Sequence, residues 1–541
     1  MNDSRILIVG IDGGTWTVLK PAVQKGYMPH LQEFLCRGTS GILQSTTPPK
    51  TPAAWAAFQT GANPGQNGIF DFTYWDKKDK TTHFINADSL LPTLWEIAGG
   101  GGKRVGVINV PLTYPPRKIN GYMITGILTP SGDSDFTWPA ELKTELRKAV
   151  PDYHIFRLKN ITQNYARHNL ELFIKQMAAV VENRARAAQY LMNKEPFDLF
   201  MVHFQATDVV QHALWGYLDS NHPLYDPDKH RFILKNFYQP LDEKISRLWR
   251  TFQEKSIGRC ALLIISDHGF QRHIKRFRLG NWLYEQGFLS IRPPTPKARL
   301  ASFLEQTLKS FCLHGPAAQG KLGRRFEQIC RPAPPSFQWD KTRVFSFSRG
   351  NDGFVYLLEP EAHNRKRTES ELREKLLQIT DPQRQVKVVE NIFTRGQIYH
   401  GAKLHLMPDL ILKPAAGYSF TGDFSPGSRN LFHIVDQQND FHVGMHHGHG
   451  IFMALGADIK AAHTCPNATI LDLAPTVLSY LGLAVPGYMD GKVLQDIFSS
   501  EISTEYTDAA YPDQAPVAPS AYSDDEQRQI ENRLRRLGYL E

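Results

Sequence analysis

The chain is poor in cysteine and has no long apolar run, and each absence excludes a class of protein. Its 541 residues include five cysteines, which are scattered and form no Cys-x-x-Cys pair. We therefore expect neither a disulfide-rich secreted scaffold nor a cysteine-ligated metal site, and a reducing, cytoplasmic compartment fits best. No stretch reaches the roughly 20 apolar residues that cross a bilayer, and the apolar run 6–11 is too short for a signal peptide. No transmembrane segment is expected.

The chain also has little excess positive charge outside one segment. The formal net charge is +8, but residues 271–335 alone hold eight Arg and four Lys against three Glu. This segment lies in an irregular, proline-bracketed stretch from about 270 to 345, which we interpret as an inserted basic cap. The cap is either a solvated surface or a basic lid over an anionic substrate. Since the rest of the chain is close to neutral, specific nucleic acid binding is not expected.

Short β-branched apolar runs alternate with longer amphipathic stretches, which predicts parallel strands joined by helices in an α/β domain over residues 1–498. The runs are 6–11, 105–110, 199–204, 261–265 and 451–455. Residues 499–522 are rich in Pro, Ala, Ser and Tyr, and are predicted to be a linker. A capping box at Ser523–Glu526 then begins a short C-terminal helix within 523–541.

Acidic and histidine side chains gather beside four of these predicted strands. Three of the sets follow a strand, and the fourth precedes the strand at 451–455. Ligand sites in open α/β sheets lie at the carboxyl ends of strands, so these side chains are candidate metal ligands. They are Asp12, Asp208, His212, Asp267, His268 and His446.

Each of these signals has an ordinary structural explanation when taken alone. An Asp after a strand commonly caps a turn. Asp208 and His212 are four residues apart, which places both on one face of a helix. The neighbours His447 and His449 could serve as ligands in place of His446. The joint occurrence of the sets at successive strands is what favours a metal site.

Thr51 lies in a predicted turn before a helix, in Pro48–Trp55. A hydroxyl residue there is commonly an N-cap. The same position also places the hydroxyl beside backbone amides and a positive helix end, which favour a bound phosphate. Thr51 is therefore either a cap, a nucleophile or both.

Taken in chain order, these motifs resemble the alkaline phosphatase superfamily, and within it the type I phosphodiesterases and nucleotide pyrophosphatases. The resemblance implies a three-layer α/β/α fold with a mostly parallel central sheet, plus the inserted cap. It also implies two divalent metal ions. Asp208, His212 and His446 would form one site, and the other would comprise Asp12, Asp267, His268 and the Thr51 oxygen.

The resemblance implies a phosphoester hydrolase that uses Thr51 as nucleophile and passes through a phosphothreonine. Mixed histidine and carboxylate ligands suit zinc, manganese or iron better than magnesium or calcium, and zinc is expected. The expected substrate is a small phosphorylated metabolite, nucleotide or lipid head group. Nucleotide pyrophosphatases of the family carry an Asn 21 residues after the Thr, where this chain has Phe72. Nucleotide specificity therefore does not carry over on that residue.

Two other functions stay open from the sequence. A transferase of phosphoryl or phospho-head groups would use the same residues with an alcohol in place of water. An inactive metal-binding scaffold would instead dock an anionic partner through the basic cap.

Overall fold

The structure is a computed structural model that describes residues 4–155, 169–292, 336–348, 350–422, 424, 430–436, 440–508, 522–537 and 539. Residues 293–335 of the expected cap and 509–521 of the expected linker lie outside this part of the chain. Within the described ranges, no helix has the length and apolarity needed to span a bilayer.

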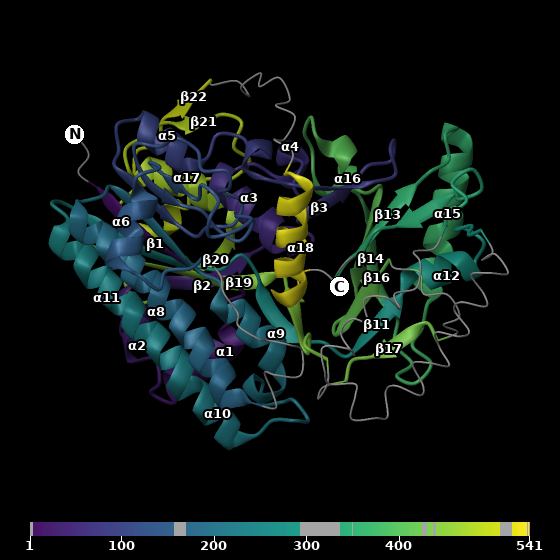
Figure 1. Ribbon diagram of the computed structural model, residues 1–541, viewed down its shortest axis with the longest axis horizontal. Coiled ribbons are helices and arrows are strands. Elements are labelled where there is room, and N and C mark those ends of the chain that lie inside the picture. Colours follow the sequence, from purple (N-terminus) through teal and green to yellow (C-terminus); the bar gives the residue numbers. More distant parts are fainter. Residues whose placement is uncertain are drawn as a thin grey trace.

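The larger lobe is built on a nine-stranded sheet in the order β20-β2-β19-β9-β1-β8-β5-β6-β7 (Figure 1). β1 is parallel to β8 and β9, β5 is parallel to β8 and β6, and β2 is parallel to β20. Two strands run the other way, because β19 is antiparallel to β2 and β9, and β7 to β6. The expected mostly parallel sheet is thus confirmed. The strands are β1 (Arg5–Ile11), β2 (Thr39–Gln44), β5 (Val105–Ile108), β6 (Gly121–Ile124), β7 (Thr137–Trp138), β8 (Leu199–Phe204), β9 (Cys260–Ile265), β19 (His449–Gly456) and β20 (His463–Thr469).

Helices cover both faces of this sheet, and the alternation of side chains along β1 shows the three layers. Leu7, Val9 and Ile11 belong to one hydrophobic cluster, whereas Ile6 and Ile8 belong to another. The first cluster includes residues of α1 (Trp16–Gln24), α2 (Pro29–Arg37), α6 (Leu142–Ala149), α8 (Leu170–Lys194), α9 (Ala206–Leu218), α10 (Pro227–Ile233), η2 (Leu234–Tyr238) and α11 (Gln239–Lys255). The second includes residues of α3 (Thr51–Thr60), α5 (Leu94–Gly100) and α17 (Leu473–Tyr480). Burial on both faces explains why the central strands are almost entirely apolar, with His203 of β8 as an exception.

A second lobe, with its own hydrophobic cluster, interrupts the larger one between β9 and β19 (Figure 1). It has a three-stranded sheet of β11 (Lys275–Arg278), β16 (Tyr418–Thr421) and β17 (Phe432–Ile434). It also has a four-stranded sheet of β12 (Val344–Ser346), β13 (Gly353–Leu357), β15 (Leu410–Pro414) and β14 (Val389–Thr394), with helices α12 (Leu279–Glu285), α15 (Ala362–Gln378) and α16 (Arg395–Ile398). The sequence did not indicate the sheet that follows residue 345, because its strands are short and their apolar runs are not distinctive.

Several shorter elements complete the structure. They are α4 (Pro64–Asn67), β3 (Thr73–Trp75) with β4 (Thr82–Phe84), β10 (Gly269–Arg272) with β18 (Gly444–His447), β21 (Val485–Pro486) with β22 (Tyr506–Thr507), and α18 (Asp524–Leu537). In Figure 1 the yellow helix α18 lies in front of the junction of the two lobes. Ile530, Leu534 and Leu537 of α18 are buried in the cluster that includes Leu7 and Val9 of β1.

Candidate functional site

The predicted ligands meet at one edge of the nine-stranded sheet. Asp12 follows β1, Asp208 and His212 lie in α9 after β8, and Asp267 and His268 follow β9. Carboxyl ends of parallel strands share an edge, so these groups are brought together as expected.

His446 reaches the same edge by a different route. It lies in β18, shortly before β19 begins, and a residue before a parallel strand would lie at the opposite edge. β19 is antiparallel to β9, however, and Phe452 near its start pairs with Ile265 at the end of β9. The reversed direction of β19 thus brings His446 to the site.

Asp208, His212 and His446 form the first set of converging atoms. Asp208 Oδ1 lies 3.5 Å from His212 Nε2 and 3.3 Å from His446 Nε2. The two Nε2 atoms are 3.0 Å apart. Ligand atoms on a tetrahedral zinc ion with bonds of about 2.0–2.2 Å lie about 3.3–3.6 Å from one another. The triangle therefore has close to the dimensions of a zinc coordination shell.

The tautomers of the two imidazoles strengthen this fit. His212 Nδ1 is 2.8 Å from Gly444 O, and His446 Nδ1 is 3.0 Å from Pro49 O. A carbonyl only accepts, so each Nδ1 carries the hydrogen and donates it. The Nε2 lone pairs of both rings therefore face each other and the Asp208 carboxylate. Three electron-rich atoms in mutual contact repel one another unless a cation lies between them.

The second set of atoms surrounds His268 Nε2. This nitrogen is 3.2 Å from Thr51 Oγ1, 3.2 Å from Asp267 Oδ2 and 3.6 Å from Asp12 Oδ1. The His268 ring also stacks on the His446 ring, with centroids 3.6 Å apart. The two sets are therefore adjacent, as metal ions of a two-metal site require.

Two buried carboxylates of this site each have one oxygen without a hydrogen-bond donor. Among the described residues, no hydrogen-bond donor is in place for Asp208 Oδ1 or Asp267 Oδ2. A buried, unpaired carboxylate oxygen is costly, and coordination of a metal removes that cost. Together with the lone-pair geometry, this donor set fits divalent metal ions.

The protonation equilibria of the site reflect the crowding of its charges. Burial raises the pKa of Asp12 well above its usual range, and the Asp267 and Asp208 carboxylates raise it further. Burial likewise raises the pKa of Asp267. Burial lowers the pKa of His212 to about 4, so its imidazole is neutral near pH 7. Neutral imidazole is the form that binds metals.

Thr51 is the first helical residue of α3, and the N-cap position is occupied by Lys50. The Thr51 side chain therefore does not act as the N-cap and points toward His268. All ten residues of α3 are buried, which fixes the start of the helix. Trp55 of α3 packs so closely on Gly10 that a Cβ there would lie 2.7 Å from the indole. This contact ties α3 to β1, the strand that precedes Asp12.

The structure brings His446 to the site, whereas His447 turns away from it. Successive residues of β18 point to opposite faces, and His446 is almost fully buried. The His447 ring instead contacts the exposed His449, with centroids 4.7 Å apart.

Three residues near the ligands were missed by the sequence analysis. His203 of β8 places Nε2 3.0 Å from Asp12 Oδ2, and a histidine within an apolar strand was a signal that could have identified it. The His442 ring lies 4.6 Å from that of His212. The Tyr539 hydroxyl donates to Asp208 Oδ2 at 2.8 Å, and no local pattern in the sequence indicates this contact.

The surroundings of Thr51 are charged and include the second lobe. Lys50 Nζ forms an ion pair with Asp71 Oδ2 at 3.1 Å, and both side chains are mostly buried. Asp352 of the second lobe is buried nearby, and burial raises its pKa to about 7. Phe72, the residue that replaces the expected Asn, is buried with its ring 5.1 Å from that of Tyr539.

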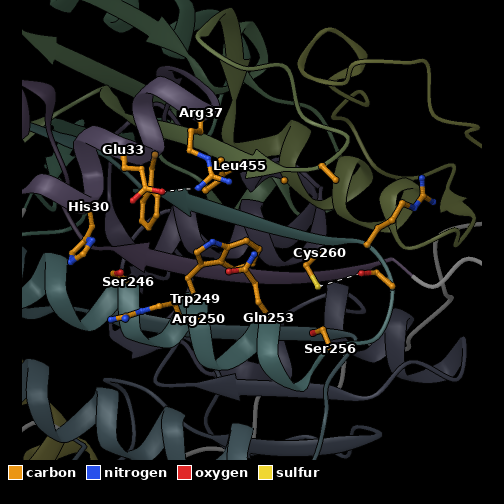
Figure 2. A pocket seen from close by; sticks show the side chains of 15 residues that line it. His30, Glu33, Arg37, Ser246, Trp249, Arg250, Gln253, Ser256, Cys260 and Leu455 are labelled. Atoms are coloured by element: carbon orange, nitrogen blue, oxygen red, sulfur yellow. Dashed lines mark hydrogen bonds and ion pairs between the residues drawn. The ribbon is translucent and has the colours of Figure 1, made fainter.

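A cavity of about 750 Å³ lies away from the candidate metal site (Figure 2). α2 and α11 form its walls, with Trp249 and Arg250 on α11. Cys260, the first residue of β9, lines this cavity, whereas Asp267 and His268 follow the other end of that strand. None of the predicted ligands lines it, so its volume does not mark the site.

Comparisons with known proteins identify the family and the fold. The family model for type I phosphodiesterase / nucleotide pyrophosphatase matches residues 6–449. Phosphonoacetate hydrolase from Sinorhizobium meliloti, solved with phosphonoformate, has a TM-score of 0.54 and 14% identity over 89% of this chain and 96% of its own. Human ectonucleotide pyrophosphatase / phosphodiesterase 5 has a TM-score of 0.49 and 14% identity over 92% of this chain and 100% of its own. Sequence comparison with curated proteins finds no relative. At these identities, the likeness to phosphonoacetate hydrolase shows the shared fold.

Proposed function

Because the chain belongs to the type I phosphodiesterase / nucleotide pyrophosphatase family, a family of phosphoester hydrolases, we propose that it hydrolyses a phosphoester with Thr51 as nucleophile and two bound metal ions. One observation carries the proposal. Thr51 Oγ1 lies 3.2 Å from His268 Nε2, the atom around which the second ligand set is arranged and beside which the first set lies. The hydroxyl is thus placed where a phosphoryl group could contact both sets.

Each ion would have its own protein ligands. Asp208, His212 and His446 would hold one, and the other would be held by Asp12, Asp267, His268 and Thr51. Zinc suits this mixture of imidazole and carboxylate, and manganese or iron would also fit. When bound, the ions would favour the Thr51 alkoxide and neutralise charge on the transferring phosphoryl group.

The chemical steps follow from the position of Thr51. Its hydroxyl oxygen attacks phosphorus and loses its hydrogen, the bond from phosphorus to the leaving oxygen breaks, and the leaving group takes up a proton. Water then attacks the phosphothreonine, the bond from phosphorus to Thr51 Oγ1 breaks, and Thr51 regains its hydrogen as phosphate or a phosphomonoester is released. The backbone amides at the start of α3 orient the phosphoryl oxygens throughout.

The substrate class is a small phosphorylated metabolite, nucleotide or lipid head group. Phe72 offers no hydrogen-bond donor from its side chain, so the proposal does not specify nucleotides. A cytoplasmic location, expected from the few scattered cysteines, stays a prediction.

The proposal is tested by hydrolysis of p-nitrophenyl phosphate and bis-p-nitrophenyl phosphate by zinc-loaded protein. We expect Thr51→Val, which keeps the shape of the side chain, to lose on the order of 10³-fold or more in kcat, as removal of a nucleophile does. Thr51→Ser should retain part of the activity because it retains a hydroxyl. Equal turnover by wild type and Thr51→Val, at equal metal content, would sink the nucleophile assignment.

Product analysis in the presence of an alcohol separates hydrolysis from transfer. Release of phosphate or phosphomonoester regardless of added glycerol supports the hydrolase. Predominant formation of a glycerol phosphoester would identify the transferase instead. Binding of zinc without turnover of any phosphoester would favour the inactive scaffold.

A further inference from the structure

The far C-terminus of the chain reaches the candidate metal site. Tyr539 donates its hydroxyl hydrogen to Asp208 Oδ2 at 2.8 Å and accepts a hydrogen bond from Gln205 Nε2 at 3.1 Å. Its ring packs at 5.1 Å from that of Phe72. A residue 331 positions away in sequence thus contacts a proposed metal ligand.

This contact rests on a firmly docked helix. Three apolar residues of α18, Ile530, Leu534 and Leu537, are buried in the main hydrophobic cluster. The Arg533 guanidinium donates to the carbonyls of Ile127, Thr129 and Pro130.

Contacts on both sides of α18 fix the direction of the chain. Before the helix, the Tyr522 hydroxyl donates to Leu128 O. After it, the Tyr539 backbone amide donates to Leu534 O, which turns the chain back toward the site.

The hydrogen bond determines which oxygen of Asp208 faces the other ligands. An ionised carboxylate has no hydrogen to donate, so the phenol is the donor and holds Oδ2. The free Oδ1 then points at His212 and His446, at 3.5 Å and 3.3 Å. Groups that hydrogen-bond to a ligating carboxylate orient it and tune the metal that it binds.

We propose that Tyr539 is a positioning residue for the Asp208 metal site, so that the C-terminal segment forms part of the active centre. This inference rests on the proposed function in that it takes Asp208 as a metal ligand. It adds that the site reaches its full metal affinity only when α18 is docked and the phenol is in place.

The test is zinc binding by the full chain, measured by competition with a chelating dye in the absence of substrate. Tyr539→Phe removes the hydroxyl and keeps the ring on Phe72. We expect it to lose about 10- to 100-fold in zinc affinity at one of two sites, as mutation of a group that hydrogen-bonds to a metal ligand typically does, while the affinity of the other site is unchanged. Activity should recover toward wild type when zinc is raised to saturation.

Two further variants make the result specific. Tyr522→Phe removes a hydroxyl from the same C-terminal segment, where it bonds to Leu128 O, and should leave both zinc affinities unchanged. Gln205→Met removes the donor to the phenol and should cause a smaller loss at the same site as Tyr539→Phe.

Two outcomes would overturn the role of Tyr539. One is wild-type affinity at both sites in Tyr539→Phe. The other is an equal loss in Tyr522→Phe, which would indicate general loosening of the segment. A chain that binds two zinc ions and hydrolyses no phosphoester refutes the proposed function alone, because the binding assay uses no substrate.

Discussion

Replacing His446 with alanine tests the first metal site most directly. The variant removes one corner of a triangle whose sides measure 3.0, 3.3 and 3.5 Å. It leaves Asp208 Oδ1 and His212 Nε2 as two ligands in place of three. Mutation of a group that only hydrogen-bonds to a metal ligand already costs about 10- to 100-fold in affinity, so loss of a ligand itself should cost more than the upper value. A hundredfold loss corresponds to about 2.8 kcal/mol of binding free energy.

The assay is zinc content by elemental analysis after dialysis against low free zinc, together with the competition titration. Wild type should retain two ions per chain, and His446→Ala should retain one. His447→Ala is the matched control, because it changes the adjacent residue of β18, whose side chain points away and contacts His449. It should retain both ions. If His447→Ala loses an ion and His446→Ala does not, His447 is the ligand and the assignment of His446 is refuted.

Two further predictions concern the surroundings of the site. Burial raises the pKa of Asp352 to about 7, whereas an aspartate in the unfolded chain has a pKa of about 4. Between these values the folded chain binds a proton that the unfolded chain does not, so the free energy of unfolding falls as the pH rises toward 7. Between pH 5 and 7, urea unfolding in chelator should therefore show wild type losing up to about 2.7 kcal/mol relative to Asp352→Asn; parallel pH profiles would contradict the assignment. Gly13 has a φ of 66°, and a Cβ there would lie 2.4 Å from Phe270 Cε2. The Gly13 amide donates to Asp267 Oδ1 at 3.1 Å, so a side chain at this position should displace a proposed metal ligand. Gly13→Ala should therefore lower kcat/KM at least tenfold and weaken zinc binding. Unchanged values of both would contradict a role of Gly13 in positioning Asp267.

The parts of the site that could be predicted from the sequence are those set by local order along the chain. Asp12 comes directly after one apolar run and Asp267 one residue after another, and both runs form parallel strands, so their common edge follows from the fold class. Asp208 and His212 share a helix face through their spacing of four. The common edge needs no knowledge of long-range pairing, whereas the adjacency of the three strands does, because β1 pairs with both β8 and β9.

The parts that could not be predicted depend on pairing between distant segments. Nothing in residues 449–456 indicates that β19 runs antiparallel to β9, yet this direction decides whether His446 reaches the site. The sheet of the second lobe was missed because strands of three to six residues leave little periodicity to detect. Tyr539 lies beyond a helix whose docking is determined by burial against residues far away in sequence.

The geometry of Asp208 depends both on local sequence order and on pairing between distant segments. Its place after β8 is local, but the direction of its carboxylate depends on Tyr539 at the end of the chain, and its partner His446 depends on the reversed strand β19. A metal bound by Asp208, His212 and His446 would therefore link the start of α9 to elements that come more than 200 residues later. A ligand that binds the folded state but not the unfolded state stabilises the folded state. Metal binding at this site should consequently favour the docked arrangement of β18, β19 and α18, and docking of α18 should in turn favour the metal.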